Sequence, residues 1–249
     1  MQAIVLARRN VREVDQIISV YTAEYGRRDL FARGVKKITS KNTAHLEPFS
    51  FVHVGIAKGR DMDHVTNVQP IEYFSSIRLD IDKLSLANYV VSLCARVFEQ
   101  NHPDHHLFTL LLTWLSSLNT SRSTNIFVLD AFIILFLSHL GFYPSFDVCV
   151  SCEKQLDADH DKYLGFSISS GGLICRSCRV TYMNQHMPIV SFTPHFRRIF
   201  RGIFSSDMDV ICRMHVPKDV EDKFHTLVYS FLTYHLGVHI PIFSFLGEE

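Results

Sequence analysis

The chain has 249 residues, 47% of them hydrophobic, which is enough to bury more than one core. There are 25 basic residues (Lys plus Arg) and 25 acidic residues (Asp plus Glu), so the overall charge gives no reason to expect DNA, a membrane or an acidic substrate as partner. Any basic surface must therefore be local. The N-terminal apolar stretch precedes its basic pair, the reverse of a secretory signal, and we expect a reducing, cytoplasmic location.

The first part of the chain, 1–78, has the pattern of a small β-barrel. Short runs of β-branched and aromatic residues are separated by turn residues, which indicates strands. The predicted strands are 3–8, 16–22, 28–34, 49–57 and 64–73. Five strands favour an OB-fold barrel, and a small SH3-like barrel is the alternative that periodicity alone leaves open.

The spacing then changes to that of helices. Apolar residues recur at helical intervals from Lys83, and further helices are predicted at 105–118, 124–140 and after Pro217. The segment 126–142 is too short to span a bilayer and predicts a buried core helix, so we expect no membrane contact. The fold class is therefore α+β and multidomain, with a C-terminal α-helical domain over 79–148 and 183–249.

The region 149–182 has few helical repeats and contains two Cys-x-x-Cys pairs. They are Cys149 with Cys152, and Cys175 with Cys178, with 22 residues between the pairs. Four thiolates at this spacing favour one structural Zn²⁺, because each pair directs two sulfurs at one ion. Two strands predicted around 169–172 make the insert a four-cysteine module similar to a zinc ribbon.

Other roles for these cysteines are weaker. A catalytic zinc ion keeps an open coordination position, whereas here four cysteines fill the set. A redox Cys-x-x-Cys normally stands alone at a helix start, so the second pair argues against it. His160, in the spacer, is an alternative ligand.

A basic segment interrupts the barrel strands. Residues 27–41 carry six basic side chains against one acid, Asp29. Phosphates attract Lys and Arg, and nearby aromatic rings stack on unpaired bases. The predicted DNA-binding residues are Arg27, Arg28, Arg33, Lys36, Lys37, Lys41, Lys58, Arg60, Tyr21, Tyr25 and Phe31. A solvated charged loop is the alternative.

A second basic cluster lies in the C-terminal part of the chain. Arg197, Arg198 and Arg201 adjoin Phe196 and Phe200. This pattern is typical of the polar face of a helix whose other face is buried, and we favour that interpretation over a binding site.

Sequence signatures of common enzymes are absent. The chain has no phosphate-binding Gly-rich loop, no Gly-x-Ser-x-Gly and no His-Glu-x-x-His, and His102, His105 and His106 lie in an inter-helix loop without an obvious cysteine or serine nucleophile. We therefore predict no catalytic residues and a protein that is not an enzyme.

The order of these parts, together with local sequence, resembles the RecO family of bacterial recombination mediators. The stretch 15–26 is followed by Ala32-Arg-Gly-Val-Lys-Lys37 and Ser40, similar to that family's N-terminal pattern. Leu140-Gly-Phe-Tyr-Pro144, leading into Cys149, is similar to the start of its zinc module. The resemblance covers nearly the whole chain.

This resemblance implies binding of single- and double-stranded DNA and annealing of complementary strands. It also implies help in loading RecA recombinase onto DNA coated by single-strand DNA-binding protein (SSB). The implied protein partners are RecR and the acidic C-terminal tail of SSB. A zinc-containing adaptor that binds acidic peptides, with only incidental DNA contact, is the alternative, and a zinc-assisted nuclease is third.

Overall fold

The computed structural model describes residues 1–37, 40, 42–122, 124–156, 164–185 and 188–238. These residues form two compact units, Met1–Thr124 and a second that begins at Asn125, called unit 1 and unit 2 below. The division into compact units falls between Thr124 and Asn125, so the helices between residue 78 and Thr124 group with the barrel. The barrel and the helices that follow it share unit 1 because they pack on one another.

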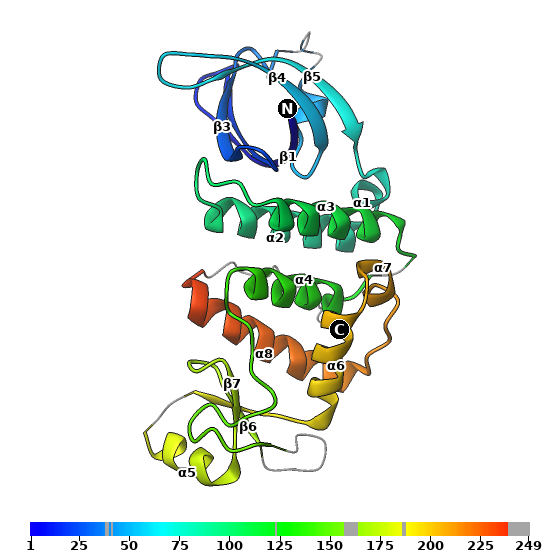
Figure 1. The fold of residues 1–249 in the computed structure, drawn as a ribbon. Coiled ribbons are helices and arrows are strands. Elements are labelled where there is room, and N and C mark those ends of the chain that lie inside the picture. The colour runs from blue at the N-terminus through cyan, green and yellow to red at the C-terminus, as the bar shows by residue number, and fades with distance from the viewer. Residues whose placement is uncertain (38–39, 41, 123, 157–163, 186–187, 239–249) are drawn as a thin grey trace. The chain divides into compact units, whose positions relative to one another are not determined.

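Unit 1 begins with a closed barrel of five strands (Figure 1). The strands are β1 Gln2–Asn10, β2 Gln16–Thr22, β3 Gly26–Ala32, β4 Phe51–Ala57 and β5 His64–Glu72, and a 3-10 helix, η1 Ala44–Leu46, lies between β3 and β4. Their order around the barrel is β1-β2-β3-β5-β4, and β3 meets β5 in parallel where Phe31 pairs with His64. A closed five-stranded barrel with this out-of-sequence closure confirms the predicted OB-fold.

Alternating side chains from the strands fill the barrel. Val5, Val20, Leu30 and Val54 are among the fully buried residues of this core. Burial of one such side chain contributes roughly 1.5–3 kcal/mol relative to an exposed position. Burial of these side chains inside the barrel stabilises it, so the loops are available for binding.

Three helices follow the barrel in unit 1. They are α1 Ser75–Leu79, α2 Ile81–Val97 and α3 His105–Thr120. The two longer helices begin at Asp80 and Asp104, whose side chains accept hydrogen bonds from backbone N–H groups of the first turn. Arg78 joins α1 to the barrel, because its guanidinium donates to Ser50 Oγ at 2.9 Å and lies 4.2 Å from the centroid of the Phe49 ring.

The turn between β2 and β3 packs against the segment that joins α2 to α3. Tyr21 stacks on Phe98 with ring centroids 3.9 Å apart. Gly26 has φ +67°, and a Cβ at this position would lie 2.3 Å from the carbonyl oxygen of His102. Only glycine fits such a close approach in the left-handed backbone region.

Unit 2 surrounds a buried helix with two other long helices and adds a small sheet. Its elements are α4 Ile126–His139, β6 Gly165–Ser167, β7 Gly172–Ile174, α5 Arg176–Asn184, β8 Ile189–Ser191, α6 Pro194–Ser205, α7 Met208–Ile211 and α8 Lys218–Leu236. α4 packs against α6 and α8, which confirms the buried helix predicted in this segment. Among the described helices, none is both long and apolar enough to cross a membrane.

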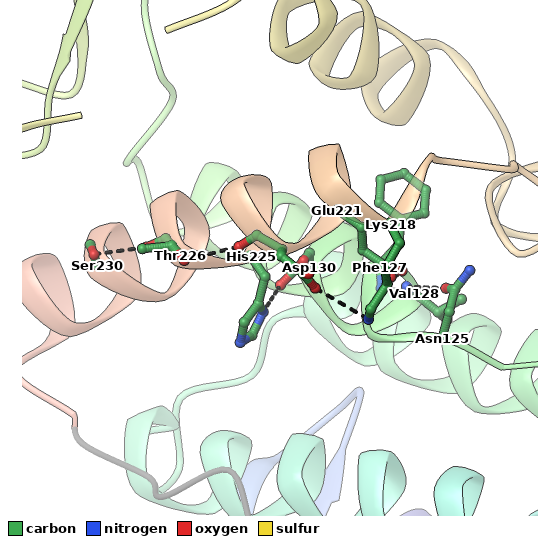
Figure 2. Close-up of polar contacts among 10 residues, drawn as sticks. Asn125, Phe127, Val128, Asp130, Lys218, Glu221, His225, Thr226 and Ser230 are labelled. Atoms are coloured by element: carbon green, nitrogen blue, oxygen red, sulfur yellow. Dashed lines mark hydrogen bonds and ion pairs between the residues drawn. The ribbon is translucent and has the colours of Figure 1, made fainter. Parts of the chain in front are cut away.

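A polar cluster lies within the apolar contact of α4 with α8 (Figure 2). Asp130 of α4 is fully buried, and its Oδ1 lies 2.7 Å from Nδ1 of His225 on α8. Burial raises the pKa of Asp130 to about 6. Burial opposes protonation of His225, but the hydrogen bond and charge of Asp130 outweigh it and raise the pKa of the imidazole. Glu221, also on α8, accepts from the backbone N–H of Phe127 at 3.4 Å.

Candidate metal centre and nucleic-acid surface

The four predicted zinc ligands come together in unit 2. Their Sγ atoms all lie within 4.8 Å of one another, and those of Cys152 and Cys175 are 3.9 Å apart. In a tetrahedral zinc site with Zn–S bonds of about 2.3 Å, the sulfurs lie about 3.8 Å apart. The four cysteines therefore fit a metal ion of this kind.

Backbone N–H groups orient the sulfurs. Cys175 is the N-cap of α5, and its Sγ accepts from the backbone N–H of Cys178 at 3.5 Å. The N–H of Cys175 in turn donates to Sγ of Cys149 at 3.4 Å. Burial disfavours the Cys149 thiolate, but the N–H groups of Cys175, Ser151 and Cys152 together lower its pKa to about 6. The thiolate is the form that binds a metal ion.

The strands around this centre form a sheet with one more strand than predicted. β6 pairs with β7 in the predicted hairpin, and β8, outside the predicted insert 149–182, pairs with the other edge of β6. The buried core beside the sulfurs is small, with Cys149, Ile174 and Cys175 as its members. So small a core favours a metal ion as a stabilising element. His160 lies outside the described residues.

Three predicted DNA-binding cations lie on the loop after β3. Arg33, Lys36 and Lys37 are exposed, whereas Lys41 lies outside the described residues. The backbone N–H of Lys36 donates to the carbonyl of Val14 at 3.0 Å, which fixes this loop against the β1–β2 loop. The three cations are thus held on an ordered part of the barrel surface.

The end of β1 and the β1–β2 loop contribute cations that sequence reasoning missed. Arg9, near the end of β1, and Arg12, on the loop, are exposed, and the Arg12 guanidinium lies 5.8 Å from the centroid of the Phe31 ring. Their place between two strands predicted to pair was visible in the sequence. Their closeness to the basic segment depends on loop contacts, which the sequence does not show.

Arg27 and Arg28 are largely occupied by contacts within unit 1. Arg27 donates to the carbonyl of Ala95 at 2.6 Å, and Arg28 forms an ion pair with Asp63 at 2.6 Å. A cavity of about 240 Å³ is lined by Arg27, Arg28 and Arg60 and by three acids, Asp29, Asp61 and Asp63. The acids balance the charge of this part of the predicted surface. Arg60 and its neighbour Lys58 are nevertheless exposed between β4 and β5.

The three predicted stacking aromatics differ in accessibility. Tyr21 is only 1% exposed, and its ring packs on Phe98, so no base can stack on it without unfolding this contact. This prediction is corrected: Tyr21 is a core residue. Tyr25 is 50% exposed on the β2–β3 turn. Phe31 is partly exposed, with its ring edge against His64 at a centroid distance of 5.4 Å.

The second arginine cluster lies on α6, whose opposite face is buried as predicted. Phe196 and Phe200 are buried, while Arg198 and Arg201 are exposed. Arg197 departs from the prediction because it is buried and pairs with Asp147 at 2.8 Å.

Comparisons with known proteins agree with this architecture. The family model described as "Recombination protein O N terminal" matches residues 1–74, and "Recombination protein O C terminal" matches residues 78–241. A DNA repair protein RecO of Desulforamulus reducens is 24% identical over 248 residues, covering 100% of this chain and 93% of the relative. One of Dehalococcoides mccartyi is 31% identical over 219 residues, with 88% and 83% covered. One of a Nocardioides species is 32% identical over 181 residues, with 72% and 73% covered. The chain therefore belongs to the RecO family of DNA repair proteins.

Proposed function

We propose that the protein is a recombination mediator that binds single- and double-stranded DNA and anneals complementary strands. In this proposal it also helps to load RecA onto SSB-coated single-stranded DNA, together with RecR. The observation that carries the DNA-binding part is the group of exposed cations on two adjoining loops of the barrel and at the end of β1. Arg33, Lys36 and Lys37 follow β3, Arg12 lies on the β1–β2 loop that this segment contacts, and Arg9 lies near the end of β1.

We assign the phosphate contacts to these five side chains. Lys58 and Arg60 extend the surface, Arg27 and Arg28 are secondary because of their internal contacts, and Lys41 remains in the proposed set. Tyr25 and Phe31 are the rings proposed to stack on unpaired bases, an interaction worth roughly 1–3 kcal/mol per base. Tyr21 is not included because it is buried.

We also propose that Cys149, Cys152, Cys175 and Cys178 bind one structural Zn²⁺, which fixes the small sheet of unit 2. Four protein ligands complete a tetrahedral shell, so the ion would act on folding and not on a reaction. The mediator is accordingly proposed to act without catalysis. RecR and the acidic tail of SSB are its proposed protein partners, RecA an indirect one, and the nucleoid in the cytoplasm its proposed location.

Salt-dependent DNA binding tests the assigned surface. For single strands, the slope of log affinity against log salt is about −0.7 per neutralised phosphate, so removal of two contacts reduces its magnitude by about 1.4. Lys36→Ala with Lys37→Ala is expected to give this change. Arg213→Ala with Lys223→Ala removes two exposed cations of unit 2 and serves as the matched control. An unchanged slope and affinity in the first variant would remove Lys36 and Lys37 from the site.

Strand annealing tests the function itself. Two complementary oligonucleotides, one labelled with a donor dye and one with an acceptor dye, are mixed with and without SSB. The mediator is expected to accelerate duplex formation in both cases, and the Lys36/Lys37 variant to be slower. A chain that binds an acidic peptide but does not accelerate annealing would be an adaptor, and the mediator proposal would be abandoned.

A further inference from the structure

Helix α6 carries a basic stripe that the barrel surface does not account for. His195, Arg198 and Arg201 are exposed at intervals of three residues, so they share one face of the helix. Phe196 and Phe200 are buried on the opposite side. From His195 to Arg201 the stripe extends about 9 Å, the length of two to three nucleotides at about 3.4 Å each.

A groove of about 630 Å³ lies beside the C-terminal end of α6. It is lined by that end of the helix and by the segment 143–147, with Tyr143, Phe146, Arg201 and Phe204 among its residues. Tyr143 is 60% exposed, and its ring centroid lies 4.7 Å from that of Phe204. An exposed aromatic ring held by a second ring is suited to stack on a planar group.

The charge of this region favours an anion that is longer than the groove. Asp147 is the acid among the lining residues, and buried Arg197 pairs with it at 2.8 Å. Arg198 and His195 continue the positive face along α6, beyond the groove. A polymeric anion can contact the groove and the stripe at once, with planar groups on Tyr143 and charges on the arginines.

We infer that α6 and the Tyr143 groove bind a second single strand of nucleic acid, in addition to the strand proposed for the barrel. The bases of a single strand are free to stack on Tyr143, whereas those of a duplex are already stacked on each other. This inference rests on the proposed function and deepens it, because a chain that anneals strands must bring two of them together. Each unit then holds one strand.

Stoichiometry on the full chain tests the inference. Native mass spectrometry with an oligothymidine of about eight nucleotides, within the usual site size of an OB-fold, counts bound strands per chain. The wild type is expected to bind two. Arg198→Glu with Arg201→Glu is expected to bind one and to slow annealing, and Lys36→Glu with Lys37→Glu is expected to do the same through the other site. Arg213→Glu with Lys223→Glu carries the same charge change and is expected to bind two.

Stacking is tested separately from charge. Tyr143→Ala is expected to weaken the second binding event roughly tenfold, as follows from a stacking contribution of roughly 1–3 kcal/mol, whereas Tyr143→Phe retains the ring and is expected to bind as the wild type does. Far-ultraviolet circular dichroism of each variant checks that the fold is kept.

The outcomes separate the inference from the proposed function. In one outcome, the α6 variant still binds two strands and anneals normally, whereas the barrel variant binds fewer strands and anneals more slowly. This outcome would overturn the inference and leave the proposed function standing. A wild type that neither binds the oligothymidine nor anneals strands would overturn both. A third outcome would overturn the inference in favour of a protein partner. The wild type would then bind a hexa-aspartate peptide but no second oligothymidine, and Arg198→Glu with Arg201→Glu would abolish binding of the peptide.

Discussion

Replacement of Asp130 by asparagine is expected to remove much of the pH dependence of stability in unit 2. In the wild type, the pKa of Asp130 is raised from 3.8 to about 6 because the carboxylate is buried. The folded state therefore holds a proton that the unfolded chain releases, and the free energy of unfolding falls as pH rises from about 4 to about 6. The pKa of His225 is raised as well, so its stabilising contribution is present below 6.5 and is lost as pH rises through the folded pKa.

The magnitude follows from the Asp130 shift. About two pKa units at about 1.4 kcal/mol each give on the order of 3 kcal/mol, an upper value because the two groups titrate together. Asparagine has nearly the same shape and can accept the hydrogen bond from His225, but it has no charge to bury. Between pH 4 and pH 8, the wild type is expected to lose up to about 3 kcal/mol relative to Asp130→Asn.

Hydrogen exchange measured by mass spectrometry on peptides from α4 and α8 is the suitable assay, after correction for the pH dependence of intrinsic exchange. The single tryptophan, Trp114, lies on α3 and reports on unit 1 instead. Asp219→Asn removes an exposed carboxylate at the start of α8 and is the matched control. Parallel stability curves for the wild type and Asp130→Asn from pH 4 to pH 8 would refute the assignment of the pH dependence to buried Asp130.

Four further predictions concern the metal centre and the barrel. Elemental analysis is expected to find one zinc ion per chain. Removal of the ion by a chelator is expected to raise hydrogen exchange in α5 while DNA binding by the barrel persists. Unchanged protection of α5 from hydrogen exchange without metal would contradict the structural role. Tyr21→Ala is expected to lower the stability of unit 1 by roughly 3–5 kcal/mol, as for other large buried side chains, in denaturation followed by Trp114 fluorescence. Tyr25→Ala is expected to weaken single-strand binding with little change in stability. If instead Tyr21→Ala weakened binding and Tyr25→Ala lowered stability, the assignments of Tyr21 to the core and Tyr25 to base stacking would be wrong. Gly26→Ala is expected to destabilise unit 1 in the same assay by more than about 1 kcal/mol, since it combines positive φ with the contact to His102.

The sequence predicted the strands of the barrel well because their spacing is local. The strand predicted at 16–22 is β2 Gln16–Thr22, and that at 64–73 is β5 His64–Glu72. Tyr21 was misassigned because β2 is buried on both faces near its end, where α2 and its loop cover the barrel. In such a strand, alternation no longer separates exposed from buried residues.

The candidate sites show the same limit. The four cysteines were found because metal ligation imposes a spacing that is visible in the chain. β8 was missed because three residues, Ile189–Ser191, carry too little periodicity to identify a strand. The charge of the basic segment 27–41 was overestimated because Asp63 was left out of the count. Asp63 lies 35 residues beyond Arg28 in the sequence but forms an ion pair with it in the fold.

The ion pair of Arg28 with Asp63 has a consequence for how the barrel responds to salt. A phosphate that reaches Arg28 takes the place of the Asp63 carboxylate, so one anion is exchanged for another. The pair brings no net positive charge to the DNA, and few counterions are released at this contact. If Arg28 contacts DNA as proposed, this contact is expected to depend less on salt than the proposed contacts of Arg33, Lys36 and Lys37. Orientation of a strand that is already bound, rather than attraction from solution, is the role that this exchange suits.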